Sequence, residues 1–340
     1  MALKFVVPLT VKPYELRRII HLWDESGDSR NPFERVLVTP CFCSPTSVSL
    51  IREELRERRG SIILFDSGGY QAQQGRITYE KLYGRLLAYY LDNQWADWYV
   101  LPDHVPISID DPEAVEHKVR DTVTVARLFY SELPPSIRER ALPVVQGHTP
   151  KQIQWCLDSY EALGVRRVGF GSFSTTGALN SINFLSKRSE EFIQWISGWS
   201  QMHDSALHLF GISGPDLFAF RDLDIDSCDS MNWYKAANFG KIFFPFVRAY
   251  SVTGGSAKLR GISEDEFYYL KDLTGHDCRF CQSFEDLAGS YWLRRMHNLT
   301  CVLDAIEMLN RGEEERIRSI FDNGLVKKSI FRRKYGHYHD

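Results

Sequence analysis

The stretch IILFDSGGYQ, residues 62–71, joins a short apolar run to an abrupt polar ending. The apolar run predicts a buried strand, and Asp66 follows directly at its end. Two glycines then allow the backbone to turn sharply or to approach a ligand closely. A carboxylate in this position is suited to face a substrate, although an Asx turn that caps the following helix explains the same residues.

Similar apolar runs alternate with amphipathic segments along most of the chain. The predicted strands are residues 35–39, 61–65, 98–101, 142–146, 167–171, 207–212 and 224–229, and the predicted helices are 46–59, 78–92, 112–133, 150–163 and 189–202. Alternation of this kind favours a parallel sheet with crossover helices. We therefore expect an α/β fold, a TIM (β/α)8 barrel, with a doubly wound open sheet as the alternative. An eighth strand is expected near residues 241–246, where a hairpin is equally compatible with the sequence.

Polar or small residues lie at or just past the C-terminal ends of six predicted strands. They are Asp66, Asp103, Gln146, Gly171, Gly211 and Asp229. In a TIM barrel the carboxyl ends of the strands meet on one face, where active sites are built. The sequence therefore predicts a functional site on that face.

The composition describes an ordinary globular chain of 340 residues, 44% hydrophobic and 25% charged. The net charge of −3 gives no overall basic surface, so contact with a nucleic acid would depend on local patches. We expect no signal peptide and no transmembrane segment. With seven cysteines, this favours a reducing cytoplasmic location, in which clustered cysteines bind a metal.

A spaced group of cysteines and histidines follows the last predicted strand. His276, Cys278 and Cys281 are close in sequence, and His297 follows on the next predicted helix. Four such ligands suit tetrahedral Zn²⁺ and fill all its positions, which predicts a structural site. The alternative is two free cysteines and two unrelated histidines.

Three regions are expected along the chain. Residues 1–250 would form most of the catalytic barrel, 251–300 a zinc-binding subdomain inserted near the last β/α unit, and 301–340 a C-terminal helix that closes the barrel and a basic tail. That tail could follow a phosphate backbone or serve only solubility. Its basic residues are Lys327, Lys328, Arg332, Arg333 and Lys334.

The chain from about residue 61 to 310 resembles the tRNA-guanine transglycosylase family, (β/α)8 enzymes that exchange guanine for a 7-deazaguanine base. The similar segments are FDSGGYQ at 65–71, VLPD at 100–103, VVQG at 144–147, VGFG at 168–171, LFGI at 209–212, DSCD at 226–229 and MHN at 296–298. The zinc ligands also match, with His276 in place of the usual first cysteine.

The resemblance implies a role for each of these positions. Asp229 would be the nucleophile that forms a covalent glycosyl intermediate, and Asp66 the general acid and base. The base would be bound by Ser67, Tyr70, Asp103, Gln146 and Gly171. Lys235 and Lys241 would contact the nucleic acid. The target nucleotide would have to leave the helical stack to reach the site.

Departures from the family favour its DNA-modifying branch, which inserts 7-cyano-7-deazaguanine (preQ0) into DNA. The segment WYKAANFG at 233–240 keeps only Lys235 and Gly240 of an arginine-containing segment that serves tRNA. Thr176 stands where the bacterial tRNA enzymes have a substrate-binding glutamate, and the spacer between Cys281 and His297 is short.

The expected partners are DNA, or alternatively tRNA, and a free 7-deazaguanine base, with helper proteins or a second copy of the chain as further candidates. Other hypotheses are a non-catalytic partner subunit of such an enzyme and a zinc-stabilised barrel that binds a sugar or nucleotide.

Overall fold

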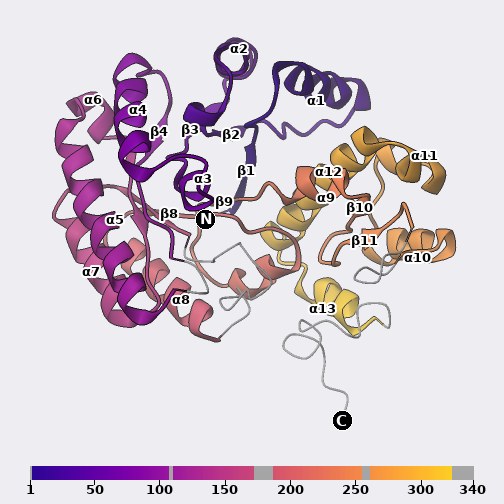
Figure 1. Cartoon of the computed structure of the whole chain (residues 1–340). Helices are drawn as coiled ribbons and strands as arrows, with labels where there is room; N and C mark the ends of the chain where they lie inside the picture. The colour runs from indigo at the N-terminus through magenta and orange to yellow at the C-terminus, as the bar shows by residue number, and fades with distance from the viewer. Residues whose placement is uncertain (1, 107–109, 172–186, 255–260, 324–340) are drawn as a thin grey trace.

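The structure is a computed structural model that describes residues 2–106, 110–171, 187–254 and 261–323. A parallel sheet of nine short strands forms its centre (Figure 1). These strands are β1 (Lys4–Pro8), β2 (Arg35–Val38), β3 (Ile62–Phe65), β4 (Trp98–Val100), β5 (Ala141–Leu142), β6 (Val144–Val145), β7 (Arg167–Phe170), β8 (Ala206–Leu209) and β9 (Ser227–Asp229). The fold is therefore α/β with a parallel sheet, as the sequence predicted.

The sheet curves into a nearly closed barrel. Its strand order is β5-β4-β3-β2-β1-β9-β8-β7-β6, so the two outermost strands, β5 and β6, are consecutive in the chain. Only Pro143 separates them, and proline has no N–H to contribute to a strand ladder. The Pro143 carbonyl nevertheless accepts a hydrogen bond of 2.9 Å from the N–H of Gly169 on β7. The segment from β5 to β6 thus joins the two edges of the sheet.

The structure corrects the prediction for one strand of the barrel. We expected a further barrel strand near residues 241–246, but β10 (Lys241–Ile242) instead pairs antiparallel with β11 (Tyr250–Ser251) in a separate two-stranded sheet. The hairpin alternative is therefore confirmed. The barrel uses β1, which the sequence analysis missed, and β1 pairs with both β2 and β9.

Helices surround the barrel and largely match the predicted amphipathic segments. They are α1 (Pro13–Ser26), α2 (Pro45–Leu50), the π-helical turn η2 (Ile51–Glu57), α3 (Gly69–Gln73), α4 (Tyr79–Asp92), α5 (Pro112–Glu132), α6 (Pro135–Arg138), α7 (Pro150–Glu161) and α8 (Lys187–Met202). Short 3-10 helices follow β2 and β8, namely η1 (Pro40–Phe42) and η3 (Gly214–Phe220). Proline in the first turn recurs in α1, α2, α5 and α7, where its missing N–H costs no hydrogen bond.

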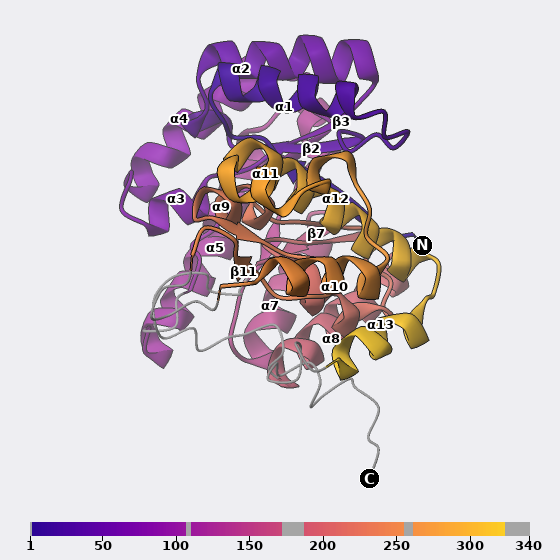
Figure 2. The same ribbon diagram turned by 90° about the vertical axis from the view of Figure 1, so that its right-hand side faces the viewer.

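The remaining helices gather at one side of the barrel. They are α9 (Asn232–Asn238), α10 (Glu264–Thr274), η4 (Arg279–Cys281), α11 (Phe284–Gly289), α12 (Tyr291–Asn310) and α13 (Glu314–Asp322). This side lies at the right of Figure 1 and faces the viewer in Figure 2. The buried Asn298 side chain on α12 donates to the carbonyls of Trp233 and Lys241 and accepts from Phe243 N–H. One amide therefore fastens α12 to both α9 and the hairpin.

Apolar side chains fill the barrel interior in two groups. Val6, Leu37 and Leu64 form one group, and Val100, Leu142 and Val144 form the other. Phe210, just after β8, packs against both groups. We call the end of the barrel where the strands finish the mouth, and the end where they begin the floor.

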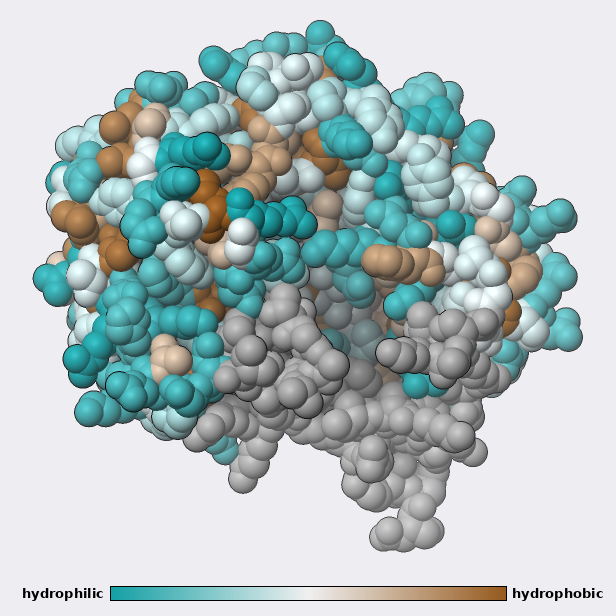
Figure 3. All heavy atoms as spheres, in the orientation of Figure 1, coloured by the Kyte–Doolittle hydropathy of each residue, from teal (hydrophilic) through white to brown (hydrophobic). Residues whose placement is uncertain are grey.

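The surface is mostly polar on the face seen in Figure 3, where hydrophobic side chains occur in small scattered groups. Among the described residues, no helix combines the length and the apolar character required to cross a membrane.

Candidate functional site

Three aspartates lie at the mouth, at or just after the ends of β3, β4 and β9. They are Asp66, Asp103 and Asp229. Because all these strands are parallel, their carboxyl ends point the same way. The charges of Asp103 and Asp229 both act on Asp66 and raise its pKa. The fold thus brings together three acids that are distant in sequence.

Asp66 has a strongly perturbed carboxyl group. Its side chain keeps some exposed surface, yet the surrounding protein removes most of its hydration. This burial raises its pKa to about 7, with a smaller contribution from the two neighbouring acids, while a 2.8 Å hydrogen bond from Thr39 Oγ1 opposes the rise. A carboxyl group with this pKa can both give and take a proton near neutral pH.

Asp103 is buried and held by two hydrogen bonds. Ser67 Oγ donates to Oδ1 at 2.9 Å, and Gln146 Nε2 donates to Oδ2 at 2.7 Å. Burial raises the pKa of Asp103 to about 6, and these two bonds limit the rise. A Cβ atom on Gly69 would lie 2.5 Å from Asp103 Oδ1, so the turn after β3 needs glycine at this position. The Ser67-Gly68-Gly69 turn and Asp103 therefore form one packed unit.

Asp229 ends β9 and is only 8% exposed. Its Oδ1 atom accepts a hydrogen bond of 3.1 Å from the N–H of Gly211 and lies 3.3 Å from His208 Nε2. No described residue donates a hydrogen bond to Oδ2. One oxygen of the carboxylate is therefore held by two neighbours, and the other has no donor within the described part of the chain.

Tyr70 and Lys235 lie together beside these acids. The Lys235 ammonium lies 5.2 Å from the centre of the Tyr70 ring, within the range of a cation–π contact. Tyr70 also accepts a hydrogen bond of 2.7 Å from Gln74 through its hydroxyl group. Burial lowers the pKa of Lys235 while the charge of Asp229 raises it, which places this lysine within electrostatic reach of the mouth.

The other predicted site residues have different surroundings. Gly171 follows β7, and a Cβ atom there would touch Phe210 at an ordinary 3.4 Å. At Gly169, by contrast, a Cβ atom would overlap the Phe210 ring. Lys241 lies in the hairpin, with its ammonium 6.0 Å from the ring centre of exposed Phe239. Thr176 and the basic residues of the tail lie outside the described residues.

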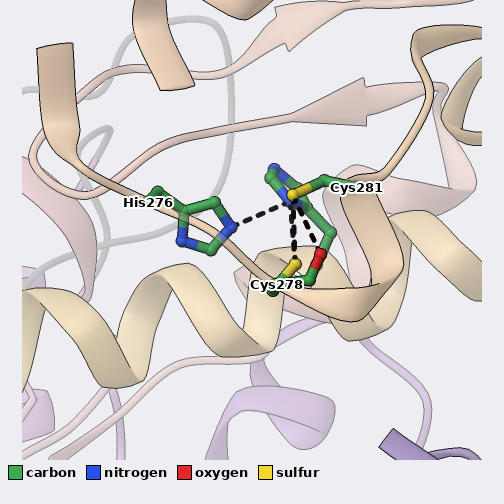
Figure 4. Close-up of side chains that lie close together, drawn as sticks. His276, Cys278 and Cys281 are labelled. Carbon is green, nitrogen blue, oxygen red and sulfur yellow. Dashed lines mark hydrogen bonds between the residues drawn. The ribbon is translucent and has the colours of Figure 1, made fainter. Parts of the chain in front are cut away.

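The predicted metal ligands form a second cluster, beyond the barrel. The side chains of His276, Cys278 and Cys281 point toward one another (Figure 4), and His297 joins them from α12. One ligand atom from each of the four residues lies within 4.8 Å of the others. Cys278 Sγ is 3.3 Å from Cys281 Sγ and 3.7 Å from His297 Nδ1. This cluster could hold a metal ion.

The outer nitrogens of both histidines have partners of the kind that metal-binding histidines use. His276 Nδ1 lies 2.5 Å from Asp304 Oδ2, and His297 Nε2 lies 3.0 Å from the Phe243 carbonyl. These contacts turn His276 Nε2 and His297 Nδ1 toward the centre of the cluster, 3.2 Å apart. A hydrogen bond from Cys278 lowers the pKa of Cys281, which favours a thiolate ligand. The residues present therefore fit a metal.

Sequence reasoning missed several residues that shape the mouth. Thr39 directly follows β2 and holds Asp66, so its place after an apolar run was an available signal. His208 lies between Leu207 and Leu209 in β8. Because neighbouring side chains of a strand point to opposite faces, a single polar residue there indicated a side chain that faces the barrel interior. Its contact with Asp229 depends on the pairing of β8 with β9, which has no local sequence signal.

No model of a known protein family matches the chain, and no curated protein matches its sequence. The function is therefore inferred from the geometry of the site and from the motifs in the sequence.

Proposed function

We propose that this protein is a TIM (β/α)8-barrel transglycosylase that exchanges guanine in DNA for a 7-deazaguanine base, preQ0. The observation that carries the proposal is the meeting of Asp66, Asp103 and Asp229 at the ends of three parallel strands. Base exchange with retention needs a nucleophile and a group that transfers protons, and two differently held carboxylates meet that need.

Asp229 is the nucleophile. An oxygen of its carboxylate attacks C1′ of the nucleotide, and the bond from C1′ to N9 of guanine breaks, with its electron pair leaving on the base. The product is an ester between Asp229 and C1′. The hydrogen bond from Gly211 to Oδ1 fixes the carboxylate for this attack.

Asp66 transfers the proton. In its protonated form it gives a proton to the departing guanine, and the resulting carboxylate removes the N9 proton of the incoming 7-deazaguanine. N9 of that base then attacks C1′ and releases Asp229. A pKa of about 7 suits both halves of this exchange at neutral pH.

Asp103 binds the edge of the base that carries N1–H and the exocyclic amine. Each carboxylate oxygen can accept more than one hydrogen bond, so Asp103 can keep the bonds from Ser67 and Gln146 while it accepts from the base. Tyr70 stacks on the base, and a donor near Gly171 contacts its O6 atom.

The choice of DNA rests on α9, the helix that follows Asp229. It contains a buried Trp233 and two buried alanines, and Lys235 is its basic residue in the segment where bacterial tRNA enzymes of the similar family have arginines. The Lys235 ammonium lies over the Tyr70 ring and the side chain is exposed to solvent, so it is placed to meet one phosphate near the flipped nucleotide.

Incubation with radiolabelled guanine or preQ0 tests the proposal, with duplex DNA, single-stranded DNA and bulk tRNA as separate acceptors. We expect label in DNA and none in tRNA. Label in tRNA alone would replace DNA by tRNA as the substrate. No label in any acceptor, from protein with intact fold and bound metal, would overturn the proposal.

We further propose that His276, Cys278, Cys281 and His297 hold a structural Zn²⁺. All four positions of a tetrahedral ion come from the protein, and the ion would join the loop after α10 to α12. We expect about one zinc per chain by mass spectrometry, and Cys281→Ser to lose it with a loss of at least ~3 kcal/mol in unfolding free energy. Cys41→Ser, a half-buried cysteine elsewhere, is the control. Zinc-free protein that resists urea as well as the zinc-loaded form would contradict this role.

A further inference from the structure

Four side chains form a continuous line of polar contacts through the barrel interior. Asp229 Oδ1 lies 3.3 Å from His208 Nε2, and His208 Nδ1 lies 3.0 Å from Ser227 Oγ. Ser227 Oγ lies 2.9 Å from Asp226 Oδ2, and all four residues are buried. We call Asp226, Ser227, His208 and Asp229 the interior network. It connects the nucleophile at the mouth with a carboxylate at the floor.

Asp226 fixes the direction of the hydrogen bonds at the floor. Its Oδ2 atom accepts from Arg35 at 2.8 Å and from Arg167 at 3.3 Å. With two guanidinium groups donating to it, Oδ2 serves as a hydrogen-bond acceptor. The Ser227 hydroxyl must therefore donate to Asp226 for their contact to be a hydrogen bond.

The proton count then determines the state of His208. A hydroxyl has one proton, so once Ser227 donates to Asp226 its oxygen accepts from His208 Nδ1–H. The contact with Asp229 needs a second proton, on Nε2, because the carboxylate also only accepts. The three contacts need three protons, and a neutral imidazole with a hydroxyl supplies only two. A neutral ring would leave one buried contact with no proton, which is costly.

We propose that His208 is a positioning residue for Asp229, that it holds protons on both ring nitrogens, and that together with Gly211 it fixes Oδ1 so that Oδ2 attacks C1′. The assignment of the attacking oxygen rests on the proposed function. The protonation of His208 follows from the network alone.

Charged groups lie at both ends of the interior network. At the mouth the network faces Asp66, whose pKa the charge of Asp229 raises, and Lys235; the Phe210 ring meets the His208 ring edge-on, with 4.4 Å between ring centres. At the floor it faces the two arginines. An imidazolium would offset one of the three acidic groups at the mouth without occupying the space of the substrate.

Nitrogen NMR of the histidine rings tests the protonation directly. Protein labelled with ¹⁵N-histidine is compared with His208→Gln, in which only the His208 signals disappear, and with Ser227→Ala. At neutral pH we expect protons on both ring nitrogens of His208, and a changed Nδ1 signal in Ser227→Ala. A neutral ring in the wild-type protein would overturn the proposal. The measurement needs no substrate, so it decides this point even if no base exchange is found.

Two substitutions of one residue test the positioning role. Glutamine at residue 208 can still donate near the place of Nε2, whereas leucine cannot. We expect His208→Leu to slow formation of the covalent adduct by ~100-fold with little change in KM, and His208→Gln to recover most of the rate. His21→Gln changes an exposed histidine on α1 and serves as the control.

An unchanged rate in His208→Leu would overturn the role, as would equal losses in the leucine and glutamine variants. If the leucine variant fails to fold, the glutamine variant decides: it should keep the wild-type KM and most of the rate. Failure of the proposed function gives a different result, because the wild-type protein would then form no adduct at all.

Discussion

Asp226 and Asp229 lie three residues apart on one stretch of chain, yet they belong to opposite ends of the barrel. Asp226, at the floor, forms ion pairs with Arg35 and Arg167. Asp229, at the mouth, lies within electrostatic reach of Asp66 and is held by Gly211 and His208. The same type of side chain is thus paired with two cations at one end of the barrel and placed near other acids at the other end.

The difference shows how one short segment can carry an ion-paired carboxylate and, three residues later, a carboxylate placed for the proposed chemistry. The Asp226 carboxylate, which forms ion pairs with Arg35 on β2 and Arg167 on β7, serves to hold these strands to the start of β9. The Asp229 carboxylate lies among other acids and has no guanidinium partner, so its place at the mouth suits the proposed chemistry better than it suits stability. The following substitutions test this division.

The largest effect is expected for Asp229 at the mouth. Asp229→Ala removes the proposed nucleophile, so base exchange should fall by at least ~10⁴-fold and the covalent adduct should disappear. Labelled-base incorporation and denaturing gels measure the two quantities. Asp222→Ala, which removes an exposed acid, is the matched control. Undiminished incorporation by Asp229→Ala would refute the assignment.

At the floor, Asp226→Asn should affect folding more than chemistry. It leaves the Arg35 and Arg167 cations without their carboxylate, and they are only 18% and 24% exposed. The free energy of unfolding should fall by about 2–4 kcal/mol, measured by urea denaturation. Asp222→Asn should change it little. A variant as stable as the wild type would mean that water solvates the Arg35 and Arg167 cations well enough to replace the carboxylate.

A pH-dependent gain in stability is expected for Asp66→Asn. The pKa of Asp66 is about 7 in the folded protein and near its ordinary value of 3.8 in the unfolded chain. Between these values the folded state binds a proton that the unfolded state has lost, so Asp66 lowers stability increasingly as pH rises, and fully above pH 7. Asp66→Asn should therefore be more stable than the wild type at pH 8 by about 1–3 kcal/mol, and the gain should vanish toward pH 4.

Urea denaturation at pH 8 and pH 4.5 measures this gain. Asp24→Asn, on the surface beside Arg59, should show no such rise with pH. An equal difference in unfolding free energy at both pH values would show that ionisation of Asp66 does not destabilise the folded protein.

The smallest effects on stability are expected for substitutions of Gly169 and Gly171, two glycines near the Phe210 side chain. Gly169→Ala should lose about 1–2 kcal/mol, because its Cβ would overlap the Phe210 ring and lie 2.9 Å from Leu142 Cδ2. Gly171→Ala makes only ordinary contacts and should stay within ~0.5 kcal/mol of the wild type while it raises the KM for the base. Thermal unfolding and exchange kinetics measure both. Equal stability losses would place both glycines in the packing of the barrel.

Local patterns predicted most of the fold. The apolar runs at 35–39, 61–65 and 167–171 correspond to β2, β3 and β7 within one residue at each end. β1 was missed because it is a short apolar run closed by Pro8, and its pairing with β9 joins positions more than 200 residues apart. No local pattern could distinguish it from an ordinary N-terminal segment.

The candidate site was predictable in its acids but not in their surroundings. Asp66 and Asp103 stand out because each follows an apolar run, and Asp229 stands out through the DSCD segment at 226–229. The partners of these acids come from other strands, as with Thr39 for Asp66 and His208 for Asp229. Such contacts depend on the register between strands, which only the assembled barrel defines.

The pairing of β1 with β9 also has a consequence for synthesis of the protein. On the ribosome, Phe5 leaves the exit tunnel long before Cys228, its partner in the sheet. Until then β1 has one unpaired edge, and Asp229 cannot take its place beside Asp66. Nascent chains shorter than about residue 229 should therefore expose a strand edge that invites aggregation or chaperone binding. Among the strand pairings of the barrel, those of β9 are the last that a growing chain can form.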